Sequence, residues 1–195
     1  MREPAAKLYI IRHGQTEMNQ RQVLQGRSDL PLNAAGEAQA RQAAERLKGV
    51  RFDHVFTSPL QRAVQTARIL VPAASPIPDA RLIEMDYGPY EGADLNRLPP
   101  EILAFFGDFA HTPAPAGMEQ LARVVDRTGA FLESIRDLRG IILISTHAIA
   151  MKGMLEYLTP ESQGAYWSKH IGNCAVYTTE RRDGGFTVPR ELAAL

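Results

Sequence analysis

The chain has 195 residues, and its 22 lysines and arginines balance its 22 aspartates and glutamates, so the formal net charge is zero. A neutral chain argues against general binding to nucleic acid or to anionic membranes, although it permits a local cluster of cations. Hydrophobic residues make up 45% and charged residues 23%, which is the balance of one globular domain, expected to span residues 1–195.

Cys174 is the only cysteine, so the chain cannot form an intrachain disulfide, and its composition gives no support to secretion. The N-terminus leads into a very short apolar run that lacks the length of a signal-peptide core. No apolar run approaches the ~20 residues that cross a bilayer. We therefore expect a cytoplasmic protein that does not insert into membranes.

The first predicted element is a buried strand at residues 8–11, Leu-Tyr-Ile-Ile, which stops at Arg12, His13 and Gly14. Ligands of open α/β sheets bind where parallel strands end, so we expect these polar groups at a binding crevice. His13 can serve as a nucleophile or as an acid or base near neutral pH, and Arg12 presents a fork of donors to phosphate or carboxylate. The Arg12 cation also disfavours protonation of the imidazole, which keeps a nitrogen lone pair free. The alternative is a histidine that only hydrogen-bonds a loop.

A helix, a strand and a second helix are predicted next. Asn33 is a suitable N-cap for a helix over 34–48. A strand over 52–57 precedes Ser58, a natural N-cap, so Arg62 is expected in the first helical turn or just beyond it. Because a helix N-terminus attracts anions, a cation facing the same space favours an anion site. The alternative is a solvated arginine on a surface helix.

Residues 81–92 place three carboxylates beside aromatic residues and glycines. We interpret one of them, Glu91, as a structural carboxylate that binds backbone amides. Residues 93–117 are predicted to form an insertion with a short helix over 101–110. This helix would be a lid that gives a substrate apolar contacts, or else a satellite core beneath a long loop. We expect substrate identity to depend on this segment.

The second half of the chain alternates helix and strand. The predicted elements are an amphipathic helix from Gly117 to Gly140, a central parallel strand over 141–147, a helix over 148–158, a strand over 171–179 and an edge strand at 186–188. His147 is the second histidine at the end of a predicted strand; one such histidine alone would more often be structural, and two of them together with two arginines strengthen the case for a functional role. We assign His54, His111 and His170 to surface or structural roles.

Several motifs, in matching order along nearly the whole chain, resemble those of the histidine phosphatase superfamily, in its phosphoglycerate-mutase-like branch. They are Arg12-His13-Gly14 with Glu17-Met18-Asn19, the Gly-x-x-Asp-x-Pro-Leu pattern that begins at Gly26, Ser58-Pro59-Leu60-Gln61-Arg62, Leu82-Ile83-Glu84 with Glu91-Gly92, and Thr146-His147. The chain departs from the family pattern at Asn33, Gln120 and Ala148, where Thr or Ser, Ser, and Gly are usual. The resemblance implies an α/β fold: a three-layer sandwich with a mostly parallel central sheet, helices on both faces and a small lid over its carboxyl edge.

The resemblance also implies a mechanism. His13 attacks phosphorus in line and becomes phosphohistidine, while Glu84 protonates the leaving alcohol and then activates water. The residues implied to hold the phosphoryl oxygens are Arg12, Arg62, Asn19 and His147, and the further positions predicted to bind phosphate or substrate are Gln25, Gly26, Tyr87 and Ala148. We expect no metal and no cofactor, because the arginines that flank the two histidines and Glu84 would repel a cation.

Other chemistries fit less well. The sequence lacks a Gly-x-x-x-x-Gly-Lys-Ser/Thr loop and a His-Glu-x-x-His helix. A cysteine phosphatase needs an arginine six residues after its nucleophile, and Glu180 stands six residues after Cys174.

Within the family, mutases carry extra basic residues in the lid, whereas Arg97 is the only Lys or Arg between residues 94 and 117. We therefore predict a histidine acid-type phosphatase that hydrolyses a small phosphomonoester, with a cofactor-dependent phosphoglycerate mutase as the runner-up. A third alternative is a phosphate-binding module that has lost turnover, against which the intact set of His13, Arg62, Glu84 and His147 argues. The sequence leaves a homodimer open.

Overall fold

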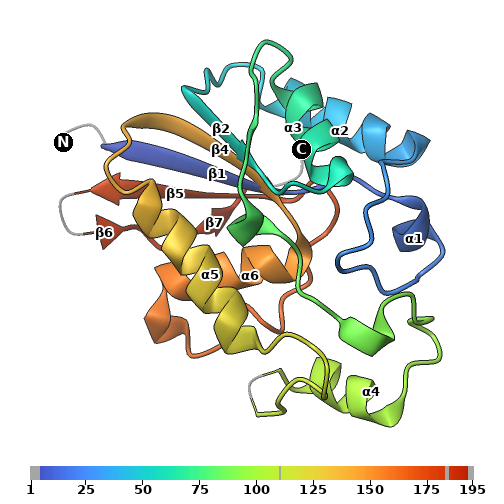
Figure 1. Ribbon diagram of the computed structural model, residues 1–195. Coiled ribbons are helices and arrows are strands. Elements are labelled where there is room, and N and C mark those ends of the chain that lie inside the picture. Colours follow the sequence, from blue (N-terminus) through green and yellow to red (C-terminus); the bar gives the residue numbers. More distant parts are fainter. Residues whose placement is uncertain (1–4, 110, 183–184, 193–195) are drawn as a thin grey trace.

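The computed structural model describes residues 5–109, 111–182 and 185–192, and its centre is a seven-stranded sheet (Figure 1). Four strands run parallel in the order β3-β2-β4-β1, and β5 continues the sheet antiparallel to β1. Two short strands, β6 and β7, pair with β5. The strands are β1 (Ala6–Arg12), β2 (His54–Thr57), β3 (Ile77–Pro78), β4 (Gly140–Thr146), β5 (Val176–Arg182), β6 (Gly185–Phe186) and β7 (Arg190–Glu191).

Four helices cover the two faces of this sheet, and two shorter ones lie beyond its carboxyl edge (Figure 1). The helices of the described residues are α1 (Glu17–Gln20), α2 (Ala34–Arg46), α3 (Gln61–Leu70), α4 (Pro100–Gly107), α5 (Leu121–Ser134) and α6 (Ala148–Leu158), with 3₁₀ turns at Ala80–Leu82, Gly88–Tyr90 and Pro160–Ser162. In Figure 1, α2 and α3 lie above the sheet, and α5 and α6 lie below it. The predicted three-layer α/β architecture is therefore confirmed.

The alternation of side chains along β1 explains the two layers. Leu8 and Ile10 belong to a core cluster that includes Phe131 of α5 and residues of α6. Tyr9 and Ile11 point to the opposite face and belong to a cluster with α2 and α3. Since both sets are apolar, the strand is buried on both faces, as expected for the centre of a mostly parallel sheet.

Several predicted boundaries were wrong, among them the edge strand expected at 186–188, which is β6 at Gly185–Phe186, and three on segments that carry or flank the site. The helix that carries Arg62 begins at Gln61, not at Ser58, and its N-cap position, Leu60, has no side-chain cap. The helix predicted over 117–140 spans only Leu121–Ser134, because Gly117 has a φ of +86° and tight turns follow Ser134. The last long strand begins at Val176 instead of residue 171, because the backbone turns at Cys174, which has a φ of +56°.

The segment predicted as an insertion carries α4, which lies off the sheet at the lower right of Figure 1. Ile102 and Phe105 are fully buried in a third core cluster that includes Met85 and Trp167, whereas Leu103 is 54% exposed. The satellite core is confirmed, and the role of residues 93–117 as a lid stays a prediction. Ala110, the predicted end of this helix, lies outside the described residues.

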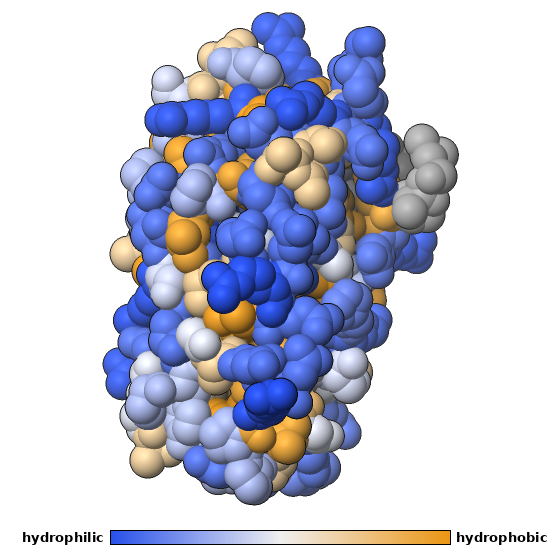
Figure 2. All heavy atoms as spheres, turned by 90° about the vertical axis from the view of Figure 1, so that its right-hand side faces the viewer, coloured by the Kyte–Doolittle hydropathy of each residue, from blue (hydrophilic) through white to orange (hydrophobic). Residues whose placement is uncertain are grey.

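Figure 2 faces the edge of the sheet at which the parallel strands end. This face is mostly hydrophilic, and hydrophobic atoms show only in small separate areas. Among the described residues, no helix is long and apolar enough to cross a membrane.

Candidate active site

The candidate site lies where β1 and β4 end next to each other. The pairing of Arg12 with Thr146 sets the two strands in register, so that His13 and His147 both follow the last paired residues. The backbone N–H of His13 donates to the carbonyl of Thr146 at 2.9 Å. The two imidazole rings lie 5.0 Å apart between centroids, at an interplanar angle of 61°. Parallel pairing thus brings together two histidines that are distant in the sequence.

The hydrogen bonds of His13 define its tautomer. Its Nδ1 lies 2.7 Å from the carbonyl oxygen of Gly14, and its Nε2 lies 3.2 Å from Nε of Arg62. Because a carbonyl only accepts and a guanidinium only donates, Nδ1 carries the proton and Nε2 carries the lone pair. The side chain of Asn173 holds the backbone of this residue by donating to the His13 carbonyl at 3.0 Å. A fixed, neutral imidazole therefore presents Nε2 to Arg62.

Arg62 comes from the first turn of α3, and its side chain is fully buried. Its terminal nitrogens donate to the carbonyls of Ser28 at 2.7 Å and Gly26 at 2.6 Å, while Nε donates to His13. These contacts use three of the five N–H donors of a guanidinium. Arg62 is therefore held rigidly beside the imidazole and keeps donors for another acceptor.

His147 is the N-cap residue of α6 and is fully buried. Its Nε2 lies 2.7 Å from the hydroxyl oxygen of Ser58, whereas its Nδ1 has no hydrogen-bond partner. Nε of Arg12 is likewise buried and unpartnered, although another nitrogen of its guanidinium donates to the carbonyl of Ile171 at 2.5 Å. Buried nitrogens without partners are rare in folded proteins and call for an explanation.

Glu84 is 4% exposed and is bonded to the N-terminus of α6, immediately after His147. One of its oxygens accepts from the N–H groups of Met85 at 2.8 Å and Ala150 at 3.0 Å, and the other accepts from Ile149 at 3.2 Å. These backbone donors fix both carboxyl oxygens. The free N-terminal amides of one helix therefore place this carboxyl group beside His147.

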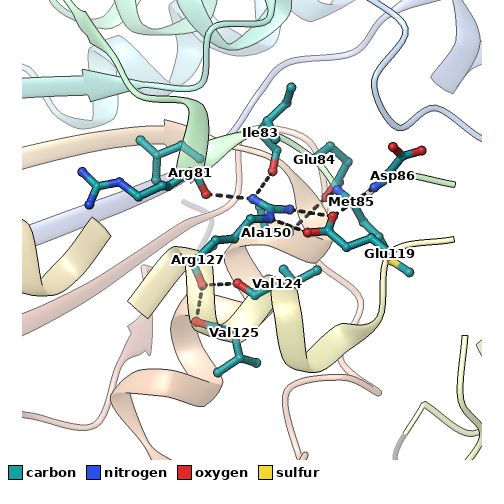
Figure 3. Close-up of polar contacts among 12 residues, drawn as sticks. Arg81, Ile83, Glu84, Met85, Asp86, Glu119, Val124, Val125, Arg127 and Ala150 are labelled. Atoms are coloured by element: carbon teal, nitrogen blue, oxygen red, sulfur yellow. Dashed lines mark hydrogen bonds and ion pairs between the residues drawn. The ribbon is translucent and has the colours of Figure 1, made fainter. Parts of the chain in front are cut away.

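A partly buried ion pair clamps the segment that carries Glu84 (Figure 3). Arg127 of α5 forms a two-point contact with Glu119, with distances of 2.7 and 3.2 Å. The same guanidinium donates to the carbonyls of Arg81 at 2.7 Å and Ile83 at 2.6 Å. Glu119 in turn accepts from the N–H of Asp86 at 3.1 Å. Arg127 and Glu119 together thus tie α5 to the backbone before and after Glu84.

Burial and the two arginines shape the electrostatics of the site. Burial is the main cause that holds the pKa of His13 well below 6.5, and the charges of Arg62 and Arg12 act in the same direction. Burial and then Arg62 likewise hold the pKa of His147 well below 6.5. Burial lowers the pKa of Arg62 to about 10, which still leaves it cationic at neutral pH. The site is thus a buried space with two cations and two neutral imidazoles.

This geometry agrees with a comparison to known families. The model of the histidine phosphatase superfamily (branch 1) matches residues 8–191 of the chain. The chain belongs to the histidine phosphatase superfamily. Of its curated relatives, the protein named probable phosphoglycerate mutase GpmB of Escherichia coli O1:K1 / APEC is 32% identical over 178 residues, which cover 87% of this chain and 82% of the relative.

Solved structures of the superfamily share the fold. Bacillus stearothermophilus YhfR superposes with a TM-score of 0.84 at 30% identity, over 94% of this chain and 95% of that one. Phosphoserine phosphatase from Entamoeba histolytica, solved with 3-phosphoglyceric acid, gives a TM-score of 0.82 at 25% identity, over 97% and 98% of the two chains.

The remaining predicted positions of this superfamily member have partners within the protein. The carboxamide oxygen of Asn19 accepts from the N–H of Thr16, and Gln25 accepts from the Thr16 hydroxyl. Gly26 donates to Glu91 and accepts from Arg62, and a side chain at this position would come within 2.5 Å of the Met85 carbonyl oxygen. Binding of phosphate or substrate by Asn19, Gln25 and Gly26 stays a prediction.

Two further predicted positions lie beside Glu84. Tyr87 is buried, and burial raises its pKa well above the ordinary value, so its hydroxyl stays protonated. Ala148 is the first residue of α6, directly after His147. Glu91 is confirmed as a structural carboxylate, because it accepts from the backbone N–H groups of Gly26, Arg27 and Ser28.

Sequence reasoning missed Ser58 as the partner of His147, Asn173 as the support of His13, and Arg127 as the clamp around Glu84. Ser58 was interpreted as a helix cap, and its hydroxyl does accept from Leu60, but the helix starts later. Among the residues the structure describes, no group of three or more His, Cys, Asp or Glu is arranged to hold a metal ion.

The two buried histidines of this superfamily member lead to a prediction on stability. Below pH 6.5 they bind fewer protons in the folded chain than in the unfolded chain, since their folded pKa values lie well below 6.5. The free energy of unfolding therefore falls as the pH drops below 6.5, by up to about 1.4 kcal/mol per histidine per pH unit. In urea unfolding experiments between pH 6.5 and about pH 5.5, the free energy of unfolding of the variant His147→Asn should fall less steeply with pH than that of the wild type.

His170 provides the matched control for this measurement, because its side chain is exposed. The variant His170→Asn should lose stability with falling pH as steeply as the wild type. If the free energy of unfolding of His147→Asn fell with pH as steeply as that of the wild type, the result would contradict a lowered pKa of the His147 imidazole.

Proposed function

We propose that the protein is a phosphomonoester hydrolase that works through a phosphohistidine on His13. The observation that carries the proposal is the environment of His13 Nε2. This atom belongs to a neutral imidazole, carries a lone pair, and lies between Arg62 and the ring of His147. Nε of Arg12 and Nδ1 of His147 are buried there without partners. With the Ser58 hydroxyl donating to Nε2, His147 carries its proton on Nδ1. A phosphoryl group is an acceptor that matches such donors in charge and in number.

In the first step, Nε2 of His13 forms a bond to phosphorus while the bond from phosphorus to the alcohol oxygen breaks. Arg12 and Arg62 hold the phosphoryl oxygens and stabilise the charge that spreads over them. Glu84, as a carboxylic acid, gives its proton to the departing oxygen. The amides of Ile149 and Ala150 at the N-terminus of α6 hold the Glu84 carboxyl group in place for this transfer.

In the second step, the Glu84 carboxylate takes a proton from a water molecule, and the water oxygen attacks phosphorus. The bond from phosphorus to nitrogen breaks, its electron pair returns to Nε2 of His13, and inorganic phosphate leaves. Neutral His13 is ready for the next cycle, because burial and the arginines disfavour the imidazolium. The proposed reaction uses no metal, and we place it in the cytoplasm.

Hydrolysis is favoured over mutase activity because Arg97, the only Lys or Arg between residues 94 and 117, is exposed on the surface. A second phosphoryl group would lack a cation from that segment. The 32% identity to a protein named probable phosphoglycerate mutase keeps a cofactor-dependent mutase as the second candidate. Isomerisation of a phosphoglycerate, stimulated by a bisphosphorylated primer, would identify that activity.

The proposal is tested by phosphate release from a panel of small phosphomonoesters, with and without EDTA. We expect turnover of at least one ester, and its rate should change less than about twofold with EDTA, because protein side chains supply all the groups in the proposed steps. Folded protein that releases no phosphate would contradict the hydrolase. Binding of the esters without release would point to a phosphate-binding module.

A further inference from the structure

One buried cation near the site has no part in the steps above. Lys152 of α6 is 8% exposed, and its ammonium donates to the carbonyl of Trp167 at 2.7 Å. The nitrogen also lies over the ring of Phe109, 5.2 Å from the centroid. Among the described residues, no carboxylate lies within 4.0 Å of this nitrogen. Buried lysines are rare unless they are paired with an anion, so this one calls for an explanation.

The position of Lys152 on α6 directs it toward the site. It lies one helical turn after Ala148, so the two residues share a face of the helix. Helical side chains lean toward the N-terminus, which here is the end that carries His147 and binds Glu84. Burial lowers the pKa of Lys152 to about 8, and the charges of Glu84 and Arg12 act on it in opposite directions. The ammonium is therefore within electrostatic reach of the catalytic groups.

Aromatic rings connect the same space to the segment over residues 93–117. The ring centroid of Phe109 lies 6.3 Å from that of Trp167 and 5.6 Å from that of Phe106. The centroid of Phe106 in turn lies 6.2 Å from that of Tyr87. Lys152 itself is 8% exposed, and its ammonium lies over one of these rings. An ion pair formed beside them would be screened less than one on the surface.

We propose that Lys152 is a specificity-determining residue whose ammonium binds a carboxylate on the alcohol part of the substrate. This inference rests on the proposed hydrolase and narrows its substrates to phosphomonoesters of hydroxy acids. A carboxylate brings one negative charge to one ammonium. A second phosphoryl dianion would leave a charge unpaired against Phe109 and Trp167, which is unfavourable in a buried site.

The test measures binding in the variant His13→Asn, which holds esters without turning them over. Calorimetry would compare two pairs that differ chiefly in the carboxylate: phosphoserine with phosphoethanolamine, and 3-phosphoglycerate with glycerol 3-phosphate. With Lys152 present, each acid should bind about 10- to 100-fold more tightly than its partner, the range for a hydrogen bond between charged groups. In His13→Asn/Lys152→Met, this preference should fall to about threefold or less.

Lys169 provides the matched control, because it is exposed and its ammonium also lies over an aromatic ring, that of Tyr166. The variant His13→Asn/Lys169→Met should keep the preference for the acids. A preference that is absent with Lys152 present, or that survives Lys152→Met, would overturn the inference, as would equal weakening of both members of a pair. Binding of propane-1,3-diol bisphosphate, which has no carboxylate, at least as tightly as 3-phosphoglycerate and with the same dependence on Lys152 would overturn the inference in favour of a second phosphoryl group.

The binding measurement tests the role of Lys152, and the turnover assay tests the proposed hydrolase. Either one can be contradicted while the other stands. Phosphate release without any preference for acids would overturn the role of Lys152 and leave the hydrolase standing. Selective binding of acids, together with no phosphate release by the wild-type chain, would overturn the hydrolase and leave Lys152 as a binding residue.

Discussion

Replacing His13 by asparagine is expected to reduce kcat by about 10⁴-fold or more, because the variant lacks the nitrogen that forms the covalent intermediate. The asparagine amide can still donate to the carbonyl of Gly14, which His13 Nδ1 contacts at 2.7 Å, so the fold should persist. Phosphate release under saturating substrate measures the loss. Circular dichroism and the midpoint of thermal unfolding verify that the variant is folded.

A chemical signature separates this role from simple binding. Rapid quenching of the wild type with a ³²P-labelled ester should trap a label that survives alkali and is released by acid, as expected for a phosphoramidate bond. His13→Asn should carry none of this label, whereas the exposed control His111→Asn should carry as much as the wild type. Label that persists in His13→Asn would assign the nucleophile to another residue.

Replacing Glu84 by glutamine should lower kcat for an alkyl phosphomonoester by about 10²- to 10⁴-fold, the range for loss of a general acid or base. The effect should depend on the leaving group. p-Nitrophenolate leaves without a proton, so its ester should still phosphorylate His13 quickly. Attack by water would remain slow, because the base is missing. We therefore expect a burst of p-nitrophenol equal to the enzyme concentration, followed by a slow steady state.

Asp86 offers a control two residues away, since its side chain is 41% exposed and pairs with Arg27 at the surface. Asp86→Asn should keep kcat within about threefold of the wild type and should show no burst. A loss in Glu84→Gln that is the same for alkyl and p-nitrophenyl esters would argue against proton transfer by this carboxyl group.

Local patterns were sufficient to predict much of the framework. Four consecutive apolar residues, from Leu8 to Ile11, predicted a buried strand, and the following Arg12 is the last residue of β1 in the structure. The helix at Ala148–Leu158 matches its prediction in both bounds. Such elements follow from neighbouring residues, because apolar periodicity and turn chemistry act over a few positions.

Contacts between distant residues could not be predicted from the pattern. The hydrogen bond from Ala150 to Glu84 joins residues 66 positions apart, and that between His147 and Ser58 spans 89 positions. Each depends on which strands become neighbours, and β4 lies between β1 and β2 although it comes later in the chain. The carboxylate of Glu91 was an exception, because its position among glycines already favoured backbone amides as partners.

The outer strands of the sheet affect how copies of this chain could meet. β3 has two residues, one of which is Pro78, whose ring nitrogen carries no hydrogen to donate. At the other side, β6 and β7 also have two residues each. Strands this short offer few free backbone groups for pairing with another sheet, which protects against fibrous aggregation. Self-association of this protein would therefore use its helices and loops. The central sheet would not continue from one molecule into the next.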